Sequence, residues 1–198
     1  MGRVREMTDD SIGNEAAEDA RVERLTGNWV YGALPLAILL ILFATFVEGI
    51  VLPVYLALPV YMLHQYEEHD ADRFLKNIND MLGPGKRGLT HVSVWVINVV
   101  FVWFLLLAVF FLARVDPGWG VIAAFLMAIN AVVHLVAAIR TRQGNPGLVT
   151  AIVLFLPLSA WIFAAQPASL LQYLVGAGLI VLLHGAIAAW ATRPVTGA

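Results

Sequence analysis

The sequence contains no cysteine, and charged residues are scarce in it. The missing cysteines exclude disulfide bonds, thiolate metal ligands and cysteine nucleophiles. Lys, Arg, Asp and Glu make up 13% of the 198 residues, against about a quarter in an ordinary soluble domain. Hydrophobic residues make up 60%, and the mean hydropathy is +0.80. These values predict an integral membrane protein that contacts membrane lipids and not nucleic acid, because a net charge of −2 provides no basic face.

No apolar run follows the first few residues, so the sequence does not predict a cleavable signal peptide. Residues 1–28 instead mix acidic and basic side chains. A short helix could form over Glu15–Leu25, but no strong apolar stripe supports it. We therefore expect a solvated, cytoplasmic polar tail, followed by a single transmembrane domain over residues 29–193.

The rest of the chain is dominated by apolar runs that are long enough to cross a bilayer. Four of them have about the 20 residues that a hydrocarbon core requires: Val92–Ala113, Trp119–Ile139, Gly147–Ala165 and Ser169–Ala191. A proline lies in each of the short connections between these runs, which favours a helix stop there. The four predicted helices therefore alternate in direction as antiparallel neighbours.

A further apolar run, over residues 32–66, is too long for one span. As a single helix its 35 residues would measure about 52 Å, against about 30 Å of hydrocarbon. Glu48 and Pro53 interrupt the run near its middle. This interruption favours a hairpin of two helices, about Trp29–Val51 and Leu52–Asp72.

The positions of the basic residues support the hairpin. With six helices, eleven of the twelve lysines and arginines lie on one side of the membrane, and only Arg114 lies on the other. With a single first span, five of the basic residues would lie on one side of the membrane and seven on the other. Because basic residues concentrate on the cytoplasmic side, the sequence predicts an all-α polytopic bundle of about six transmembrane helices with both termini cytoplasmic. We expect it in an inner or plasma membrane.

A short amphipathic segment follows the second predicted span. Its apolar residues recur at helical spacing: Phe74, Leu75, Ile78, Met81 and Leu82. Polar residues occupy the rest of the helical wheel. The pattern predicts an interfacial helix over Asp70–Leu82, lying across the entrance to the membrane domain with its Phe74 and Ile78 face in the acyl region.

Ionisable residues gather in the cytoplasmic half of the second span. At about 100° per residue, His64, Glu67 and Glu68 occupy one third of the helix circumference. His69 points about 140° away from His64, so we expect it beside this group and not in it. Charged groups in membrane helices are costly and usually functional.

Polar residues of three other spans lie at the same depth. Counted from the cytoplasmic helix ends, Asn98, His134 and His184 fall with His64 within about 9–12 Å of one membrane surface. His91 lies at the mouth of this layer. All five histidines thus share one leaflet. The sequence therefore predicts a pocket among the second, third, fourth and sixth helices.

Two interpretations of this cluster compete. A single polar residue such as His91 or Asn130 is typical of a hydrogen bond between neighbouring helices, and we expect these two in the outer shell or entrance of the site, with His69 and Asn98. Two adjacent carboxylates, however, repel each other, and burying both without a cation is expensive. A divalent metal removes that cost, and imidazole and carboxylate are usual ligands of zinc and iron. The candidate metal ligands are His64, Glu67, Glu68, His134 and His184.

The run His-Gln-Tyr-Glu-Glu at residues 64–68 resembles the signature of the HXXEE family of membrane proteins. Two further features of that family are a later histidine, matched by His134, and a Tyr-x-Pro-Gly motif. The second is matched at residues 144–147, except that Gly144 replaces the tyrosine. The resemblance extends from about Leu52 to the C-terminus. The family has no established activity, so the resemblance implies a site at these residues without naming a reaction.

Two metal chemistries remain open. In the first, His64 and Glu68 bind one zinc ion as an i, i+4 pair. His134 or His184 is then the third ligand, and Glu67 is the catalytic general base for a metal-bound water. In the second, all five residues hold two iron ions with a bridging glutamate, as in enzymes that oxidise or desaturate lipid chains. The usual motif of such iron sites is Glu-x-x-His, the reverse of the order here, so we favour one zinc-like metal over iron.

The location of the site predicts its substrate. A centre about 10 Å inside the cytoplasmic leaflet would meet the ester or amide bond of a lipid more readily than a soluble metabolite. The favoured function is therefore a zinc-type hydrolase that acts on a lipid or lipid-like substrate. The alternative outside enzymes is a cation or proton transporter that uses the same residues, although the outer half of the bundle offers little beyond Glu48.

Overall fold

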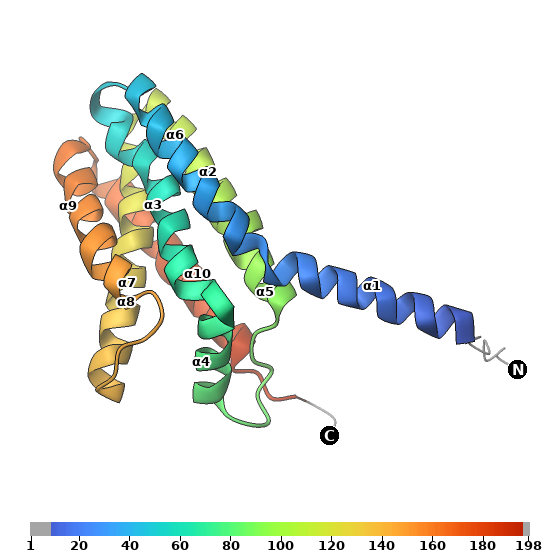
Figure 1. Ribbon diagram of the computed structural model, residues 1–198. Coiled ribbons are helices and arrows are strands. Elements are labelled where there is room, and N and C mark those ends of the chain that lie inside the picture. Colours follow the sequence, from blue (N-terminus) through green and yellow to red (C-terminus); the bar gives the residue numbers. More distant parts are fainter. Residues whose placement is uncertain (1–8, 196–198) are drawn as a thin grey trace, which may run out of the picture.

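The structure, a computed structural model, describes residues 9–195, and its long elements are all helices (Figure 1). Six helical stretches in this part of the chain are long and apolar enough to cross a membrane: Ala17–Phe46, Gly49–Leu82, His91–Val115, Pro117–Thr141, Leu148–Ala165 and Leu170–Ala191. They form one bundle. The predicted all-α class and the count of six membrane helices are confirmed.

The first two membrane helices form the predicted hairpin. α2 (Trp29–Phe43) and α3 (Leu52–His69) are joined by two short 3-10 turns, Ala44–Phe46 and Gly49–Val51. Gly49 has a φ of +73°, a left-handed conformation that costs glycine little because it has no Cβ. The reversal of the chain therefore occurs where Glu48 and Pro53 interrupt the apolar run.

Small residues bring these two helices close together. Ala33 and Ala37 of α2 are fully buried and pack with Met62 of α3. Residues without long side chains allow close backbone approach, and dispersion contacts then hold membrane helices together in the absence of a hydrophobic driving force. A larger core cluster joins α3 to the later helices through Tyr61 and Phe155, among others.

The third and fifth membrane helices each contain a π-helical stretch. In the third, α5 (His91–Trp95) continues through the π-helix Val96–Trp103 into α6 (Phe104–Val115). In the fifth, α8 (Leu148–Thr150) continues through the π-helix Ala151–Phe155 into α9 (Leu156–Ala165). π-helical turns are rare and frequently lie at functional sites.

The fourth and sixth membrane helices are regular. α7 (Val121–Thr141) follows the 3-10 turn Pro117–Gly120, and α10 (Leu170–Ala191) begins at a capping box made by Ser169 and Gln172. The ends of the four later predicted spans differ from the observed ends by at most two residues. The proline-containing connections thus marked the helix boundaries.

The polar N-terminal segment is more regular than we expected. Its described part forms α1 (Asp9–Gly27), which projects from the bundle in Figure 1 and is exposed over residues 17–25. Asn28 closes its C-terminal turn by donating to the backbone carbonyl of Arg24 at 2.8 Å. The absence of an apolar stripe correctly predicted exposure, but the stretch is rich in strong helix formers, which favour a helix even in water.

The amphipathic segment forms a helix where we expected one. A short 3-10 turn at Asp70–Asp72 is followed by α4 (Arg73–Leu82), which lies at the lower end of the bundle in Figure 1. Ala71 and Asp72, at the corner between α3 and α4, both have positive φ, 54° and 59°. The apolar face of α4 was expected in the acyl region. It packs instead on the protein, against Leu89 and Val94, because α5 and α10 offer an apolar surface there.

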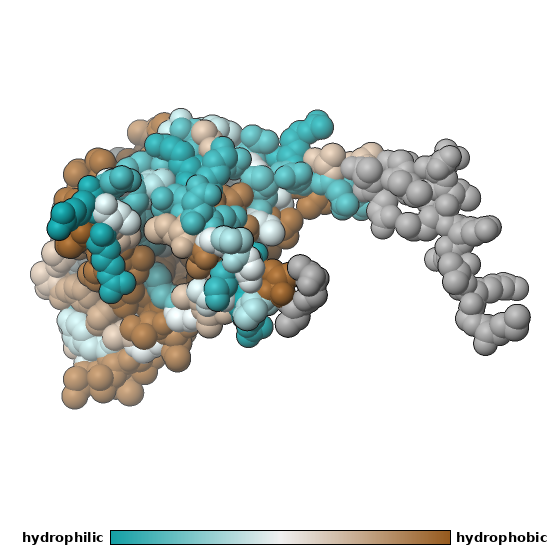
Figure 2. Space-filling view, turned by 90° about the horizontal axis from the view of Figure 1, so that it is seen from below, coloured by the Kyte–Doolittle hydropathy of each residue, from teal (hydrophilic) through white to brown (hydrophobic). Residues whose placement is uncertain are grey.

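The surface of the bundle divides into an apolar side and a polar end. Large apolar side chains on the outer sides are well exposed, as for Phe104 at 67% and Leu182 at 72%. Such exposure suits a hydrocarbon surrounding and would be unfavourable in water. The end of the molecule that carries α4, seen from below in Figure 2, is mainly hydrophilic, with apolar surface around it.

We expect Gly120→Ala to destabilise the bundle. A Cβ built on Gly120 would lie 2.6 Å from Cγ2 of the buried Val54 in α3, so the turn and α3 would have to separate. Overpacking of this kind costs about 1–3 kcal/mol. Thermal unfolding of the purified protein in detergent measures the effect as a lower Tm.

Gly178→Ala is the matched control, because nothing lies within 4 Å of a Cβ at that position of α10. It should leave Tm unchanged or raise it slightly, since alanine has the better helix propensity. If both variants lowered the Tm equally, the close contact of Gly120 with α3 would not be the cause of the lost stability.

Candidate metal centre

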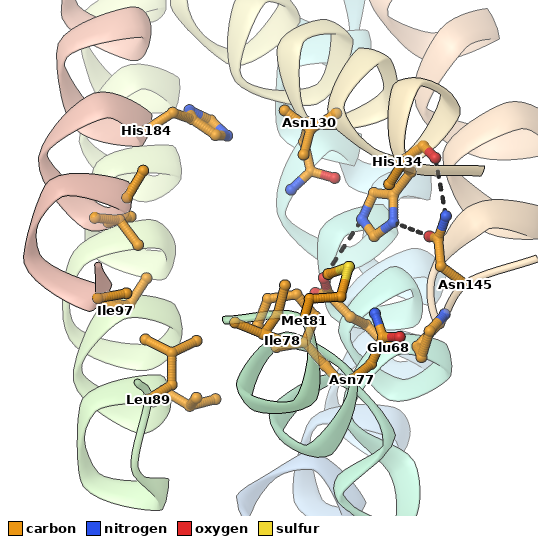
Figure 3. Close-up of a pocket in the computed structure, with 18 of the residues that line it drawn as sticks. Glu68, Asn77, Ile78, Met81, Leu89, Ile97, Asn130, His134, Asn145 and His184 are labelled. Atoms are coloured by element: carbon orange, nitrogen blue, oxygen red, sulfur yellow. Dashed lines mark hydrogen bonds and ion pairs between the residues drawn. The ribbon is translucent and has the colours of Figure 1, made fainter. Parts of the chain in front are cut away.

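Three of the predicted ligands converge between α3 and α7. His64 and Glu68 lie one turn apart on α3, and His64 Nε2 is 3.6 Å from Glu68 Oε2. His134 of α7 places its Nε2 3.4 Å from Glu68 Oε1, a contact drawn in Figure 3. The three side chains are almost completely buried, and one ligand atom from each lies within 4.8 Å of the other two. This group could hold a metal ion.

The hydrogen bonds of His64 determine which of its nitrogens is free. Its Nδ1 lies 2.9 Å from the hydroxyl of Thr150, and that hydroxyl donates its single proton to Glu67 Oε2 at 2.5 Å. The hydroxyl can therefore only accept from His64, so Nδ1 carries the proton. Nε2 then presents a lone pair to the group, and it is buried with no hydrogen-bond partner.

Asn145 fixes His134 in the same way. Its amide donates from Nδ2 to the backbone carbonyl of His134 at 2.9 Å, which turns its Oδ1 toward the ring. Nδ1 of His134 donates to that oxygen at 2.7 Å. The Nε2 atom of a neutral His134 therefore also presents a lone pair to Glu68. A metal-binding histidine usually donates its other ring nitrogen to an oxygen in this manner.

The third member of the group, Glu68, is held by His69. His69 Nε2 lies 3.2 Å from Glu68 Oε2 and 3.4 Å from Nδ2 of Asn98. We expected His69 beside the group and not in it, and it lies there. Each of the three converging side chains thus has a neighbour outside the group.

Glu67 does not face this group. One of its oxygens accepts from the backbone nitrogen of Val149 at 3.2 Å, and the other accepts from the backbone and the hydroxyl of Thr150. Adjacent residues of a helix point about 100° apart, so Glu67 and Glu68 diverge to different neighbours. The predicted roles of Glu67 as ligand and general base do not match this orientation, in which three donors from α8 surround its carboxylate.

His184 also stays outside the group. It projects from α10 across the pocket from His134 (Figure 3), and its Nδ1 donates to the backbone carbonyl of Ile180 at 2.9 Å. The sequence placed it correctly among the residues that line the pocket. Depth alone does not determine the distance between helices, and the pocket keeps α10 away from α3 at this level.

Three other predicted residues lie around the centre. Asn98 accepts from Gln65 at 2.9 Å and lines the pocket, and Asn130 donates to the hydroxyl of Tyr61 at 3.1 Å. His91 instead bridges two carboxylates outside the pocket. Its ring lies 3.3 Å from Glu23 of α1 and 3.1 Å from Asp72, so it joins three elements and does not form the pocket mouth.

The pocket has a volume of about 520 Å³ and lies among the four helices that the sequence predicted. Its polar wall contains Glu68, His69 and His134. Most of the rest is apolar, including Ile78 of α4, Ile97 of the π-helix and Ile187 of α10. A pocket of this size suits a small ligand or part of a lipid chain.

The loop before α8 and α8 itself contribute residues to which the sequence assigned no role. Asn145 of the loop and Thr150 of α8 fix the two imidazoles, and Gly147 lies directly against them. A Cβ on Gly147 would be 2.8 Å from Cε1 of His64 and 2.9 Å from Cε1 of His134. Its φ of +87° also favours glycine. In the sequence, the Asn-Pro-Gly motif at residues 145–147 was the feature that indicated this loop.

Comparison with known families agrees with these observations. The model of a family described as "Protein of unknown function with HXXEE motif" matches residues 55–162. The chain belongs to the HXXEE family. The match includes the motif, His134 and the loop before α8. No curated protein and no solved structure matches the chain.

Four of the five residues of the HXXEE motif have an identifiable structural task in this chain. The first and last residues, His64 and Glu68, face the centre, while Glu67 holds α8. Gln65 donates to Asn98 and accepts from the indole of Trp103 at 2.7 Å, so it links the motif to the π-helix of the third membrane helix. Side chains of this five-residue motif therefore point in three directions around α3: toward the centre, toward α8 and toward the third membrane helix.

Gly147→Ala should disrupt the centre. The added methyl group would displace both imidazoles, and the positive φ adds backbone strain, so we expect a lower Tm and weaker binding of Zn²⁺ or Co²⁺. Metal binding is measured by equilibrium dialysis and the Tm by thermal unfolding.

Gly144→Ala is the control in the same loop, because nothing lies within 4 Å of a Cβ there. It should retain the metal affinity and the Tm of the unmodified chain. A normal metal affinity in Gly147→Ala would contradict the tight approach of this loop to the two histidines.

Proposed function

We propose that the protein is a metal-dependent hydrolase of the membrane, in which His64, Glu68 and His134 hold one zinc-like divalent ion. The observation that carries the proposal is the convergence of three buried acceptors. Nε2 of His64 is buried without a hydrogen-bond partner, and Nε2 of a neutral His134 presents a lone pair, both beside the carboxylate of Glu68. A divalent cation among these atoms would satisfy both imidazoles and balance the carboxylate.

The donor set favours zinc, because imidazole and carboxylate are usual zinc ligands and two histidines with one carboxylate form the group. A centre with two iron ions would need Glu67 and His184 as well, and both are directed to other partners.

The surroundings of the centre support a hydrolytic role. Two histidines and one carboxylate would leave a bound zinc ion with an open position, at which the ion would supply Lewis-acid activation of water. Asn130 and His69 line the pocket beside the group, so a bound carbonyl could approach from that side. Glu67 acts through Thr150 as a positioning residue, because its carboxylate fixes the hydroxyl that orients His64.

The pocket supports a lipid or lipid-like substrate. Its walls away from the centre are mainly apolar, and α4 covers them at the polar end of the molecule. An acyl chain could occupy this volume while its ester or amide bond reaches the metal. The centre then acts in the leaflet on the side of α4, which the basic residues assign to the cytoplasm.

Metal analysis of the protein purified without added metal tests the centre. We expect about one equivalent of zinc, and its loss in His134→Ala and Glu68→Ala, because each removes a ligand. Thr150→Val leaves the ligands in place but frees the imidazole of His64, so it should weaken metal affinity by about 10–100-fold. The metal-loaded protein should release fatty acid from acyl esters or amides in micelles, and EDTA should stop the release.

Thr141→Val is the control for Thr150, since the hydroxyl of Thr141 bonds to its own helix at Ala137. It should keep full metal affinity. Metal retained in all ligand variants would refute the centre. Metal bound without hydrolysis of any acyl ester or amide, together with metal-dependent proton or cation flux in vesicles, would favour the transporter instead.

The cysteine-free chain offers a direct test of the proposed orientation. Gly144→Cys lies in the exposed loop before α8, and Thr45→Cys lies in the exposed turn after α2. With both termini cytoplasmic, a membrane-impermeant maleimide should label Thr45→Cys on intact cells and Gly144→Cys only after permeabilisation. The reverse pattern would place the centre in the outer leaflet.

A further inference from the structure

The pocket beside the proposed centre has buried walls and an exposed rim. Its walls include Leu89 and Val94, which are 7% and 5% exposed. Other lining residues are exposed: Met81 of α4, Val133 of α7, and Gly185, Ala188 and Thr192 of α10. Because these residues line the pocket and are also open to the outside, they mark its mouth. The mouth therefore lies between α7 and α10, next to α4.

The mouth extends far along the two helices, away from their polar ends. Gly185 lies seven residues before Thr192, which is about 10 Å along α10 at 1.5 Å per residue. Val133 lies eight residues before the end of α7 at Thr141, about 12 Å along that helix. An opening to water alone would be confined to the polar end of the bundle. The mouth is instead a slit, with Val133 on one edge and Gly185 and Ala188 on the other.

The slit exists because α7 and α10 pack closely at one end only. Near the start of α10, a Cβ built on Gly176 would lie 3.1 Å from Cδ2 of Phe125 in α7. A residue without a side chain allows this close approach of two membrane helices. At Gly185 nothing lies within 4 Å of a Cβ, and His134 and His184 lie on opposite sides of the pocket (Figure 3). The two helices therefore diverge toward the end that carries α4.

The outer surface on both sides of the slit is apolar. Val132 and Val136 of α7 are 53% and 40% exposed, and Leu182 of α10 is 72% exposed. In a membrane helix, such side chains contact the acyl chains of the surrounding lipids. The slit therefore joins the pocket to the hydrocarbon of the bilayer, and an acyl chain can enter it without passing through water.

The ends of α7 and α10 beside the slit carry positive charge. After Asp116 the sequence contains no acidic residue, and its basic residues are Arg140, Arg142 and Arg193. All three are exposed, and in the described part of the chain none of them takes part in an ion pair. Arg140 lies in the last turn of α7, and Arg193 lies two residues beyond the end of α10. Guanidinium groups pair with phosphate oxygens, and basic residues at a membrane surface attract anionic lipids.

We propose that the ligand of this pocket is a lipid with a negatively charged headgroup, which enters sideways from the leaflet on the side of α4. Its acyl chain passes through the slit into the apolar part of the pocket, and its phosphate stays at Arg140, Arg142 and Arg193. The proposal rests on the proposed function, since it names the substrate and the route to the same centre. A water-soluble ester is then a poor substrate, because it offers neither the chain nor the charge that this opening selects.

Photochemical labelling of the full-length protein in phosphatidylcholine vesicles tests the route. The probe is a phosphatidylglycerol with a diazirine at the end of one acyl chain, and mass spectrometry identifies the labelled peptides. Leu89 and Val94 line the pocket and are nearly buried, so a chain labels them only from inside it. We expect label at these two residues. Label confined to outward-facing residues such as Phe104 would overturn the proposal.

Gly185→Trp should reduce the label at Leu89 and Val94 several-fold, because the indole would occupy the slit. Gly178→Trp is the matched control and should keep the label. Gly178 lies seven residues earlier on the same face of α10 and does not line the pocket, and nothing lies within 4 Å of a Cβ at either position. Val133→Trp blocks the opposite edge and tests the slit even if Gly185→Trp fails to fold. Equal labelling in the control and in the folded blocked variants would overturn the proposal.

The same diazirine chain on phosphatidylcholine tests the headgroup. This probe should label the pocket about fivefold less than the phosphatidylglycerol, which is the effect of about one contact between an arginine and an anionic lipid. Arg140→Gln and Arg193→Gln should each reduce this preference. Arg114→Gln is the control and should retain it, because Arg114 lies at the end of α6, on the other side of the membrane by the predicted topology. Equal labelling of the unmodified chain by the two lipids would overturn the proposal.

Zinc content, measured on the same samples, separates this inference from the proposed function. None of the substituted residues belongs to the centre, so all variants should keep their metal. Label in the pocket of a protein that binds no metal would retain the lipid site and remove the hydrolase. Bound metal without label in the pocket would overturn the lipid route and leave the metal centre.

Discussion

The carboxylate of Glu68 is buried inside a bundle whose outer sides are apolar, and the neighbouring residues are arranged around its charge. Burial of an unpaired carboxylate is too costly to persist, so its charge must be balanced nearby. In the described part of the chain, the ionisable side chains in contact with it are three imidazoles, and no lysine or arginine reaches it. Imidazoles balance this charge only as protonated rings or together with a bound cation.

The neighbours of those imidazoles favour the cation. Thr150 and Asn145 orient His64 and His134 so that Nε2 faces Glu68. A protonated His134 could satisfy one oxygen of Glu68, but Nε2 of His64 would still lie buried without a partner. The loop before α8, together with α8 itself, therefore supports the two histidines from outside the group, although both are remote in sequence from the motif in α3.

Periodicity and composition were sufficient to predict the helices and the hairpin at Glu48. Counting residues along each helix brought His134 to the level of His64 and Glu68, with which it forms a group that could hold a metal ion. It failed for His184, because the direction of a side chain and the spacing between helices depend on packing that the pattern does not contain. It also failed for Glu67, whose partners are backbone and hydroxyl donors of Val149 and Thr150. Such donors carry no sequence signature.

The bond between Glu67 and α8 has a consequence for the order of assembly in the membrane. The motif belongs to the second membrane helix, but Thr150 belongs to the fifth, more than eighty residues later. During synthesis, α3 must therefore enter the bilayer with two carboxylates that have not yet met their final partners. Glu67 gains its partners only when the fifth helix inserts. Until then, the nascent chain needs water, protons or another protein beside α3. Insertion of this chain thus depends on a late helix to stabilise an early one.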